Sequence, residues 1–536
     1  MPVLLWLRRR RTALLVLLAL ALRFDLLGTP FVEYFSNREV QNAIPIRMMQ
    51  EGLGFWQLPN AWTDTYGIAE FQLLPLMVRA GYGLLESVGV AQRPQAGDAA
   101  AAARYYLQVA TLGRLWSLLM AAVAMVGLRR LLATGWSVDV ADLALLFYAV
   151  SPFNRFYDQL FIVEPTIMAL SILALLQLRV WSERPQGGWA RFAAAAAAVS
   201  LVLLLKISHV FIGLPVAWLM VRRWGLRAAL RWPLWAFGAV ALLPAVFFYK
   251  VGFGGSVEGL DSLAWDNTKA MVSNWAYVSE MALKFMERHA WTIWTPLGSG
   301  LLLGGMSVAC RHRDEPQRSL SRLLLVWSAA WIYYWFMGGP MSGHYYYQAP
   351  SVPLAVAFMA LAAETAAARW RPGVRRLAIV ACVVTFLVFG EVVQRVNDED
   401  SRFWRGGWCQ TILTAGLKAD RRLPPHAQIV AGCRGAVQFM LFYYVHRGGW
   451  GLRVEDSDLP QADAPARLEE LREQGAGFYV AAFGYDGPRY NGVVFDRAVF
   501  DELPIARYLR EHYTLLEQDD VHLIYDLGSR NAAPLR

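Results

Sequence analysis

Apolar blocks separated by short charged runs recur along most of this 536-residue chain. Each block is about 15–25 residues long, which is the length a helix needs to cross the hydrocarbon core of a bilayer. Hydrophobic residues make up 56% of the sequence and charged residues only 17%, a balance that soluble domains rarely reach. The pattern predicts a polytopic α-helical membrane protein.

The net charge of +9 comes from arginines in the short runs between these blocks. They gather at 8–11, 129–130, 222–231, 311–322 and 369–376. Cytoplasmic loops of membrane proteins carry this excess of positive charge. The basic balance therefore indicates orientation in a membrane and does not call for a nucleic-acid partner.

The apolar blocks predict eleven spans. They lie at about 12–28, 107–128, 137–153, 164–181, 191–205, 207–221, 232–249, 290–310, 322–338, 350–368 and 376–393. The first block lacks the small-residue cleavage site of a signal peptide, so we interpret it as a retained helix with a cytoplasmic N-terminus. Alternation then puts every arginine run in the cytosol and puts 29–106, 154–163, 206, 250–289, 339–349 and the tail outside.

Two segments decide whether this alternation holds. A full span at 71–89 would move every later arginine run to the wrong side, so this segment is expected to lie along the interface or to re-enter. The segment 191–221 is long enough for one tilted helix. A single helix would export the arginines of 222–231, so we predict two short helices that meet at Lys206.

From 394 onward the sequence changes to that of a soluble domain. Buried strands are predicted at 428–432, 477–483 and 521–527, and amphipathic helices at 464–474 and 497–512. Alternating helices and strands indicate a small α/β domain, which the topology places outside the membrane. The predicted domains are thus 1–393, a transmembrane segment with the outer loop 29–106, and 394–536, an exported domain. An oxidising compartment would allow Cys409 and Cys433 to pair, and the alternative is two buried thiols.

The first outer loop concentrates ionisable groups beside the membrane. Such groups are costly near hydrocarbon and point to function. Transfer of a sugar from a lipid phosphate needs a carboxylate to accept the proton of a hydroxyl group, and donors that stabilise the departing phosphate. Glu39 and Glu33 are candidate bases, the planar Arg38 suits phosphate, and Asp64 and Glu70 lie where the chain returns to the membrane. The alternative is a solvated surface cluster, with Asp64 in a turn and Glu70 as an interfacial cap.

Later segments add polar groups on the same predicted side. The loop 151–165 carries Asp158 and Glu164, although a short loop of a transporter looks similar. Lys206 is a lone cation among apolar residues and needs an anion, for which a lipid phosphate or Glu164 would serve.

His209, close to this lysine, is interpreted as a satisfied helix histidine. The loop 338–350 supplies His344 and Tyr345, either as donors and stacking rings or as an interfacial aromatic belt. No CxxC, HExxH or Walker pattern appears, so zinc hydrolysis and nucleotide-driven pumping find no support.

These segments resemble, in order, motifs of the GT-C class of polyprenyl-phosphate-sugar glycosyltransferases, which includes protein O-mannosyltransferases and the bacterial aminoarabinose transferase. The resemblance rests on SNREVQNAIPIRMMQEG (36–52), AEFQLLPL (69–76), SPFNRFYDQLFIVEP (151–165), LKISHVFIGLP (205–215) and GHYYYQAPSVPLA (343–355). It covers about 30–355, and the tail resembles the exported α/β domain of that class. One departure is clear, because the family often has an aspartate before the glutamate that aligns with Glu39, where this chain has Asn37 and Arg38.

The resemblance implies an inverting, single-displacement transferase in the bacterial inner membrane. Its donor would be an undecaprenyl-phosphate hexose or pentose, and its acceptor a glycan, lipid or protein on the outer face. The base stays open among Glu39, Glu33 and Asp64, with Lys206, Arg38 and His344 around the lipid phosphate. Metal dependence varies across the class, so the resemblance leaves open whether a divalent metal is required. It implies no other cofactor.

Two other functions are compatible with the membrane pattern. A lipid-linked-sugar flippase or other transporter would favour inverted repeats and charges at the bilayer midplane, whereas here the charges gather in outer loops and no repeat is evident. A noncatalytic membrane subunit that presents its tail to a partner would leave the acidic loop without a role.

Overall fold

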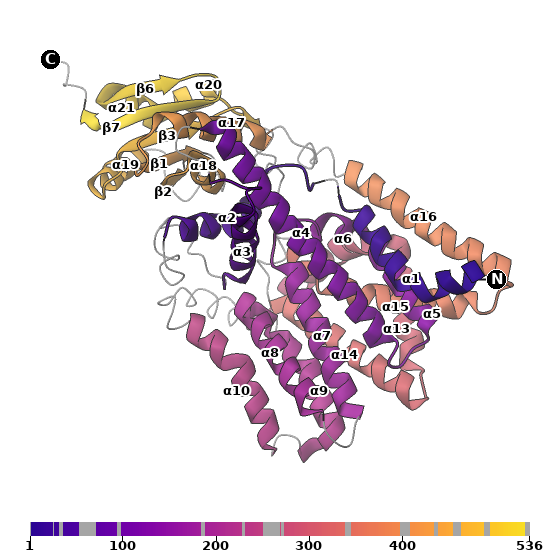
Figure 1. Cartoon of the computed structure of the whole chain (residues 1–536). Coiled ribbons are helices and arrows are strands. Elements are labelled where there is room, and N and C mark those ends of the chain that lie inside the picture. The colour runs from indigo at the N-terminus through magenta and orange to yellow at the C-terminus, as the bar shows by residue number, and fades with distance from the viewer. Residues whose placement is uncertain are drawn as a thin grey trace. The chain divides into compact units, whose positions relative to one another are not determined.

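The computed structural model describes most of the chain. The described residues are 2–24, 26–31, 36–52, 71–93, 98–183, 188–227, 231–249, 269, 273–337, 345–396, 408–433, 438–453, 463–486 and 494–530. They form many helices and a small sheet near the C-terminus (Figure 1). Contacts divide the chain into two compact units, Met1–Leu26 with Leu115–Gln394, and Leu27–Arg114 with Arg395–Arg536.

The first unit is built from helices. They are α1 (Pro2–Ala21), the second half of α4 (Ala99–Leu132), α5 (Val138–Val150), α6 (Pro152–Tyr157), α7 (Glu164–Glu183), α8 (Trp189–Leu205), α9 (Gly213–Trp224), α10 (Trp232–Phe247), α12 (Trp275–Met286), α13 (Thr295–Cys310), α14 (Glu315–Met337), α15 (Ser351–Ala367) and α16 (Pro372–Val396). A helix overlaps each of the eleven predicted apolar ranges.

Fewer helices meet a strict test of length and hydropathy for crossing a membrane. Within the described residues, α4, α7 and the first 18 residues of α16 meet it. The segments Trp275–Trp291 and Thr295–Cys310, bent by 106° at their junction, bring the number to four if they form one span. Shorter apolar helices include α8, α10 and α15. The prediction of eleven spans stays a prediction.

The helix break predicted at Lys206 is confirmed. α8 ends at Leu205, Lys206 has an extended backbone (φ −161°, ψ 99°), and a 3-10 helix, η2 (Ile207–Ile212), leads into α9. Extended geometry cannot continue an α-helix, so the backbone here turns out of the helical path. Figure 1 shows α8 beside α7 and α10, against both of which it packs.

A close approach of α13 to α15 forms part of the core of the first unit. A Cβ added at Gly305 would lie 1.8 Å from the carbonyl oxygen of Phe358. Only glycine fits between the two backbones there, since any side chain would overlap that oxygen.

The second unit contains a five-stranded mixed sheet. Its strands are β1 (Gln428–Cys433), β2 (Gly448–Arg453), β3 (Phe478–Ala482), β6 (Tyr513–Gln518) and β7 (His522–Arg530), in the order β2-β1-β3-β7-β6. β1 is parallel to β2 and β3, while β7 is antiparallel to β3 and β6. β4 (Tyr485–Asp486) and β5 (Val494–Phe495) form a separate two-stranded sheet.

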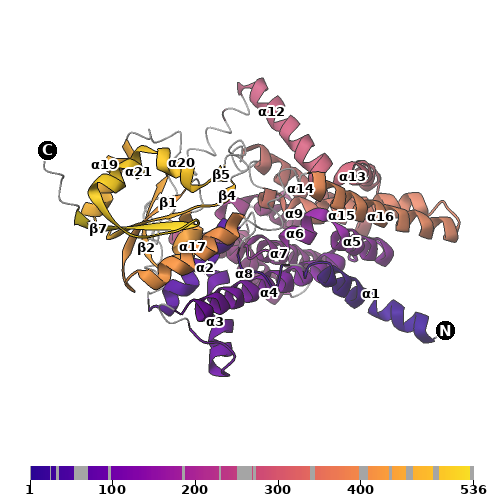
Figure 2. The same ribbon diagram turned by 90° about the horizontal axis from the view of Figure 1, so that it is seen from above.

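Helices cover both faces of this sheet. They are α17 (Trp408–Arg422), α18 (Gln438–Val445), α19 (Ala464–Glu473), α20 (Arg497–Glu502) and α21 (Pro504–His512). Figure 2 shows α19, α20 and α21 on one side and α17 on the other. The predicted strands at β1, β3 and β7 are confirmed, as is the helix at α19. The helix predicted at 497–512 is broken at Leu503, which has an extended backbone and precedes Pro504. Proline disfavours the helical conformation of the residue before it.

The second unit also includes α2 (Ser36–Gln50), α3 (Leu73–Ser87) and the first half of α4. The sequence grouped 29–106 with the membrane segment, whereas contacts place 27–114 in the same compact unit as 395–536. The functional division into 1–393 and 394–536 stays a prediction. α3 has 15 residues, which is too short for a full span.

Candidate functional site

Lys206 lies in a buried polar cluster of the first unit, which we call the Lys206 cluster: Glu164, Lys206, Tyr346 and Tyr347. The Lys206 ammonium is 2.6 Å from Glu164 Oε1, and the two side chains are 6% and 1% exposed. The ammonium also lies 3.7 Å from the centre of the Tyr347 ring and 5.2 Å from that of Tyr346. A carboxylate and two aromatic faces thus surround one desolvated cation.

Local backbone structure explains how these side chains meet. Glu164 is the first residue of α7, where the helix dipole stabilises negative charge. Lys206 occupies the extended break after α8, and the tyrosines lie on the short 3-10 helix Tyr345–Gln348. The sequence left open whether the anion for Lys206 is a lipid phosphate or Glu164, and in this structure Glu164 takes that place.

The second oxygen of Glu164 has no hydrogen-bond partner in the described part of the chain. Nearby His209 is 2% exposed, and neither of its ring nitrogens has a hydrogen-bond partner among the described residues. This differs from the interpretation of His209 as a satisfied helix histidine. Burying polar atoms without partners costs free energy, so the Lys206 cluster retains unused capacity to bind a polar ligand.

Asp158 belongs to a second buried pair of the first unit. Arg23 donates from Nε to Asp158 Oδ2 at 3.2 Å, and the Tyr148 hydroxyl lies 3.4 Å from Asp158 Oδ1. Arg23 is 1% exposed and also donates to four backbone carbonyls. Burial raises the pKa of Asp158 to about 6, against the opposing charge of Arg23. Arg23 fixes the loop that carries Asp158 to the end of the first helical segment.

Glu39 forms a two-pronged ion pair in the second unit. Arg114 Nε and Nη2 lie 2.9 and 3.0 Å from the two carboxylate oxygens, and both side chains are 0% exposed. Arg114 also donates to the carbonyl and hydroxyl oxygens of Thr29, both at 2.8 Å, and its guanidinium lies 5.5 Å from the centre of the Phe31 ring. This bidentate geometry holds the Glu39 carboxylate in one orientation. To accept a proton, Glu39 would have to loosen one of these bonds.

A third ionic group lies at the end of α2. Glu51 Oε1 is 2.9 Å from Arg47 Nε and 3.1 Å from His446 Nε2. Burial alone would raise the pKa of Glu51, but the His446 hydrogen bond and the Arg47 charge outweigh it and lower the pKa to about 2. Arg47 also donates to the carbonyl of Tyr443 at 3.0 Å, so this group ties α2 to α18.

Several predicted site residues lie outside the described part of the chain. These are Glu33, Asp64, Glu70 and His344, together with the side chains of Arg38, Tyr345, Cys409 and Cys433. Of the rest, Glu164 and Lys206 come together in the first unit, where Asp158 pairs with Arg23 instead, and Glu39 belongs to the second unit. The convergence of Glu39 with Lys206 and His344 stays a prediction.

Sequence reasoning missed the two arginines that pair with acids in these loops. Arg23 lies in the apolar range 12–28 and Arg114 in 107–128, so both were counted as span residues. A lone charge inside an apolar block is itself a signal for a buried partner. In the part of the chain that the structure describes, no group of three or more His, Cys, Asp and Glu is placed to hold a metal ion.

Solved structures of other proteins share this arrangement of helices and strands. The chain aligns with ArnT from Cupriavidus metallidurans bound to undecaprenyl phosphate over 96% of its own length and 97% of that chain, with a TM-score of 0.56 and 12% identity. It aligns with the archaeal oligosaccharyltransferase AglB from Archaeoglobus fulgidus, in complex with an inhibitory peptide and a dolichol-phosphate, over 96% of its own length and 74% of that chain, with a TM-score of 0.57 and 11% identity. The chain has the GT-C fold.

A third GT-C structure is the arabinofuranosyltransferase AftD from Mycobacteria. The alignment covers 97% of this chain and 40% of that one, with a TM-score of 0.53 and 16% identity. No family model and no curated protein sequence matches the chain. The resemblance in the loop motifs is therefore confirmed at the level of the GT-C fold.

Proposed function

We propose that this protein is an inverting membrane glycosyltransferase that moves a sugar from an undecaprenyl-phosphate donor to an acceptor on the outer face of the bacterial inner membrane. The observation that carries the proposal is the Lys206 cluster, a buried ammonium at a helix break with aromatic rings around it. The GT-C fold supports it, since two similar structures were solved with bound undecaprenyl phosphate or dolichol-phosphate.

The chemistry explains why such a cation is useful. The acceptor hydroxyl attacks the anomeric carbon while the bond from that carbon to the phosphate oxygen breaks. A carboxylate takes the hydroxyl proton, and the phosphate leaves with one more negative charge than it had in the donor. A fixed cation in a desolvated site stabilises this developing charge. Because the proposed reaction is a single displacement, the anomeric configuration inverts.

Lys206 is the proposed contact for the phosphate, and Glu164 holds the ammonium in place when no lipid is bound. Without a counter-charge this lysine would be costly to bury. The remaining proposed contacts to the phosphate are Arg38, His344 and Tyr345. The proposed base is Glu39, Glu33 or Asp64, with Glu70 and Asp158 as further acids of the outer loops.

Binding of undecaprenyl phosphate to the purified full-length protein tests this proposal. Lys206→Met leaves Glu164 unpaired and endangers folding, so it is compared with Lys206→Met/Glu164→Gln, which removes both charges. Lys284→Met is the matched control, because Lys284 is also 2.6 Å from a glutamate but its side chain is 41% exposed. Thermal unfolding reports whether each variant is folded.

We expect both Lys206 variants to bind undecaprenyl phosphate at least about tenfold more weakly, since a charge-assisted bond contributes on the order of 1.5–3 kcal/mol. The Lys284 variant should bind as the wild type does. Equal affinity in a folded Lys206→Met/Glu164→Gln variant would overturn the assignment of Lys206. Reconstituted protein that moves the lipid-linked sugar across vesicles without forming a glycosylated product would indicate a flippase instead.

A further inference from the structure

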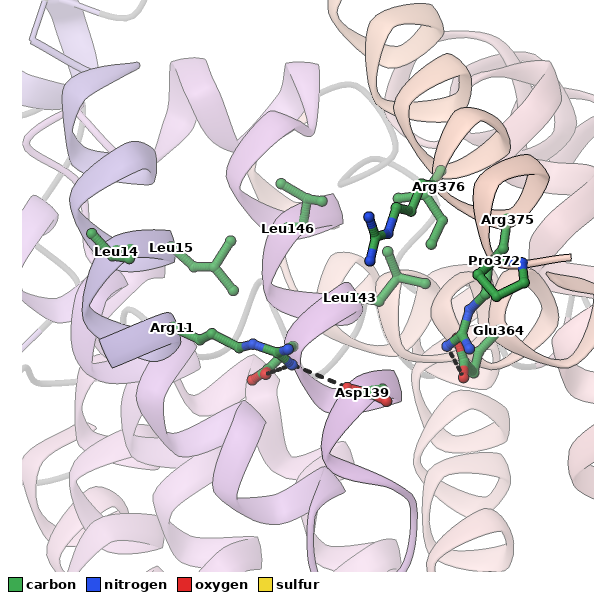
Figure 3. A pocket seen from close by; sticks show the side chains of 12 residues that line it. Arg11, Leu14, Leu15, Asp139, Leu143, Leu146, Glu364, Pro372, Arg375 and Arg376 are labelled. Carbon is green, nitrogen blue, oxygen red and sulfur yellow. Dashed lines mark hydrogen bonds and ion pairs between the residues drawn. The ribbon is translucent and has the colours of Figure 1, made fainter. Parts of the chain in front are cut away.

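A cavity of about 520 Å³ lies among α1, α5, α15 and α16 of the first unit (Figure 3). One part of its wall is apolar and consists of Leu14 and Leu15 from α1, Leu143 and Leu146 from α5, and Ile379 from α16. None of these residues belongs to the Lys206 cluster. The cavity is therefore a candidate site of its own.

Charged side chains line the other part of the cavity. Arg11 is 3.1 Å from Asp139 and 3.6 Å from Asp142. Asp142 also accepts from Arg129 at 2.6 Å, and Arg129 is not one of the residues that line the cavity. These pairs neutralise both aspartates of α5.

A second pair joins α15 and α16, where Arg375 is bonded to Glu364. Arg376 follows directly and is exposed. It lines the same cavity, and Figure 3 shows its guanidinium apart from both pairs. Among the described residues it takes part in no hydrogen bond or ion pair. Three arginines and three carboxylates line the cavity, and Arg129 adds a fourth arginine through its bond to Asp142. All three carboxylates are paired with the other arginines, so Arg376 leaves this group with one positive charge for a ligand to balance.

The charge pattern of the sequence assigns this end of the helices to the cytosol. Arg11 belongs to the run 8–11, Arg129 to the run 129–130, and Arg375 and Arg376 to the run 369–376. These runs set the predicted orientation. The cavity therefore faces the cytosolic leaflet, whose anionic lipids are attracted to basic sites at the membrane surface.

We propose that this cavity binds one anionic phospholipid of the cytosolic leaflet. Its phosphate pairs with Arg376, and the upper part of one acyl chain lies against the leucines and Ile379. A zwitterionic lipid fits less well, because its own cation already balances its phosphate. Free phosphate would not cover the apolar wall, so binding would not gain the free energy of burying that apolar surface.

The test uses full-length protein in mild detergent and counts bound lipid by native mass spectrometry during titration. The probes are phosphatidylglycerol, phosphatidylcholine and inorganic phosphate. Arg376→Gln removes the free cation, and Arg371→Gln is its control, since Arg371 is exposed directly before α16 and does not line the cavity. Ile379→Trp fills the apolar part, and Leu377→Trp, at an exposed position of α16, controls for the added ring.

We expect one phosphatidylglycerol per protein, bound at least about tenfold more weakly by Arg376→Gln and by Ile379→Trp, and unchanged by both controls. Phosphatidylcholine binding as tight as that of phosphatidylglycerol would overturn the requirement for an anion. Displacement of the lipid by millimolar inorganic phosphate would show a simple phosphate site. Unchanged phosphatidylglycerol binding in Arg376→Gln would show that the lipid binds elsewhere.

This proposal is independent of the transferase proposal. Lys206→Met/Glu164→Gln should keep its phosphatidylglycerol, and Arg376→Gln should keep its affinity for undecaprenyl phosphate. If one variant loses both lipids, the two binding events share a site and the present proposal fails.

Discussion

Replacing Glu39 by glutamine should destabilise the second unit strongly. The substitution removes the carboxylate charge that pairs with the fully buried Arg114 guanidinium, and breaking a buried pair in this way costs about 3–5 kcal/mol. Glutamine keeps one acceptor oxygen, and Arg114 retains its bonds to Thr29. We therefore expect the lower end of the range, about 3 kcal/mol.

The matched control is Glu86→Gln. Glu86 pairs with Arg93 at the same 2.9 Å separation, but these side chains are 23% and 60% exposed. An exposed pair of this kind contributes at most about 1 kcal/mol. The comparison therefore isolates the effect of burial from that of the bond itself.

Thermal unfolding of the detergent-solubilised protein measures the difference, supported by limited proteolysis of the second unit. For a unit of a few hundred residues, each kcal/mol shifts the midpoint by about 2–4 °C, so Glu39→Gln should lower it by about 6–12 °C. A midpoint within about 2 °C of that of Glu86→Gln would refute the reasoning. Removing both charges with Glu39→Leu/Arg114→Met should restore part of the loss, because neither charge is then left unpaired.

Two further predictions concern the first unit. Gly305→Ala should lower the unfolding midpoint of the first unit, because overpacking costs about 1–3 kcal/mol. Gly300→Ala in the same helix should leave the midpoint unchanged, because a Cβ there meets no atom within 4 Å. Equal midpoints for the two variants would contradict the close approach of α13 to Phe358. Asp158 binds its proton more tightly in the folded protein, where its pKa is about 6, than at its ordinary pKa of 3.8. The unfolding midpoint of the wild type, measured relative to that of Asp158→Asn, should therefore fall as the pH rises from 3.8 to about 6. Above about pH 6 the difference should stay constant. A relative midpoint that rises over this interval would show that the charge of Arg23 outweighs burial.

The sequence could locate the helices of the first unit because their apolar blocks are long and uninterrupted. The break at Lys206 was also predictable, since one continuous helix would have exported the arginines that follow it. Strands β1, β3 and β7 show as short apolar runs. Strand β2, Gly448–Arg453, was missed because its three glycines have low strand propensity. It forms because β1 pairs with it along its whole length.

The ion pairs show what local patterns cannot supply. The sequence indicated Glu164 as one possible partner for Lys206, because a lone cation among apolar residues needs an anion. It gave no means to choose Arg114 for Glu39, which is 75 residues away. Such a pairing depends on how the helices pack, and an arginine inside an apolar block is counted as a span residue when only its neighbours in sequence are considered.

A structure of the full-length protein with bound undecaprenyl phosphate would show directly whether Lys206 contacts the phosphate. We expect phosphate oxygens within about 3 Å of the Lys206 ammonium, the distance of a charge-assisted hydrogen bond, with Tyr346 and Tyr347 beside the lipid. A phosphate bound away from Lys206, with the ammonium still paired with Glu164, would contradict the assignment of Lys206.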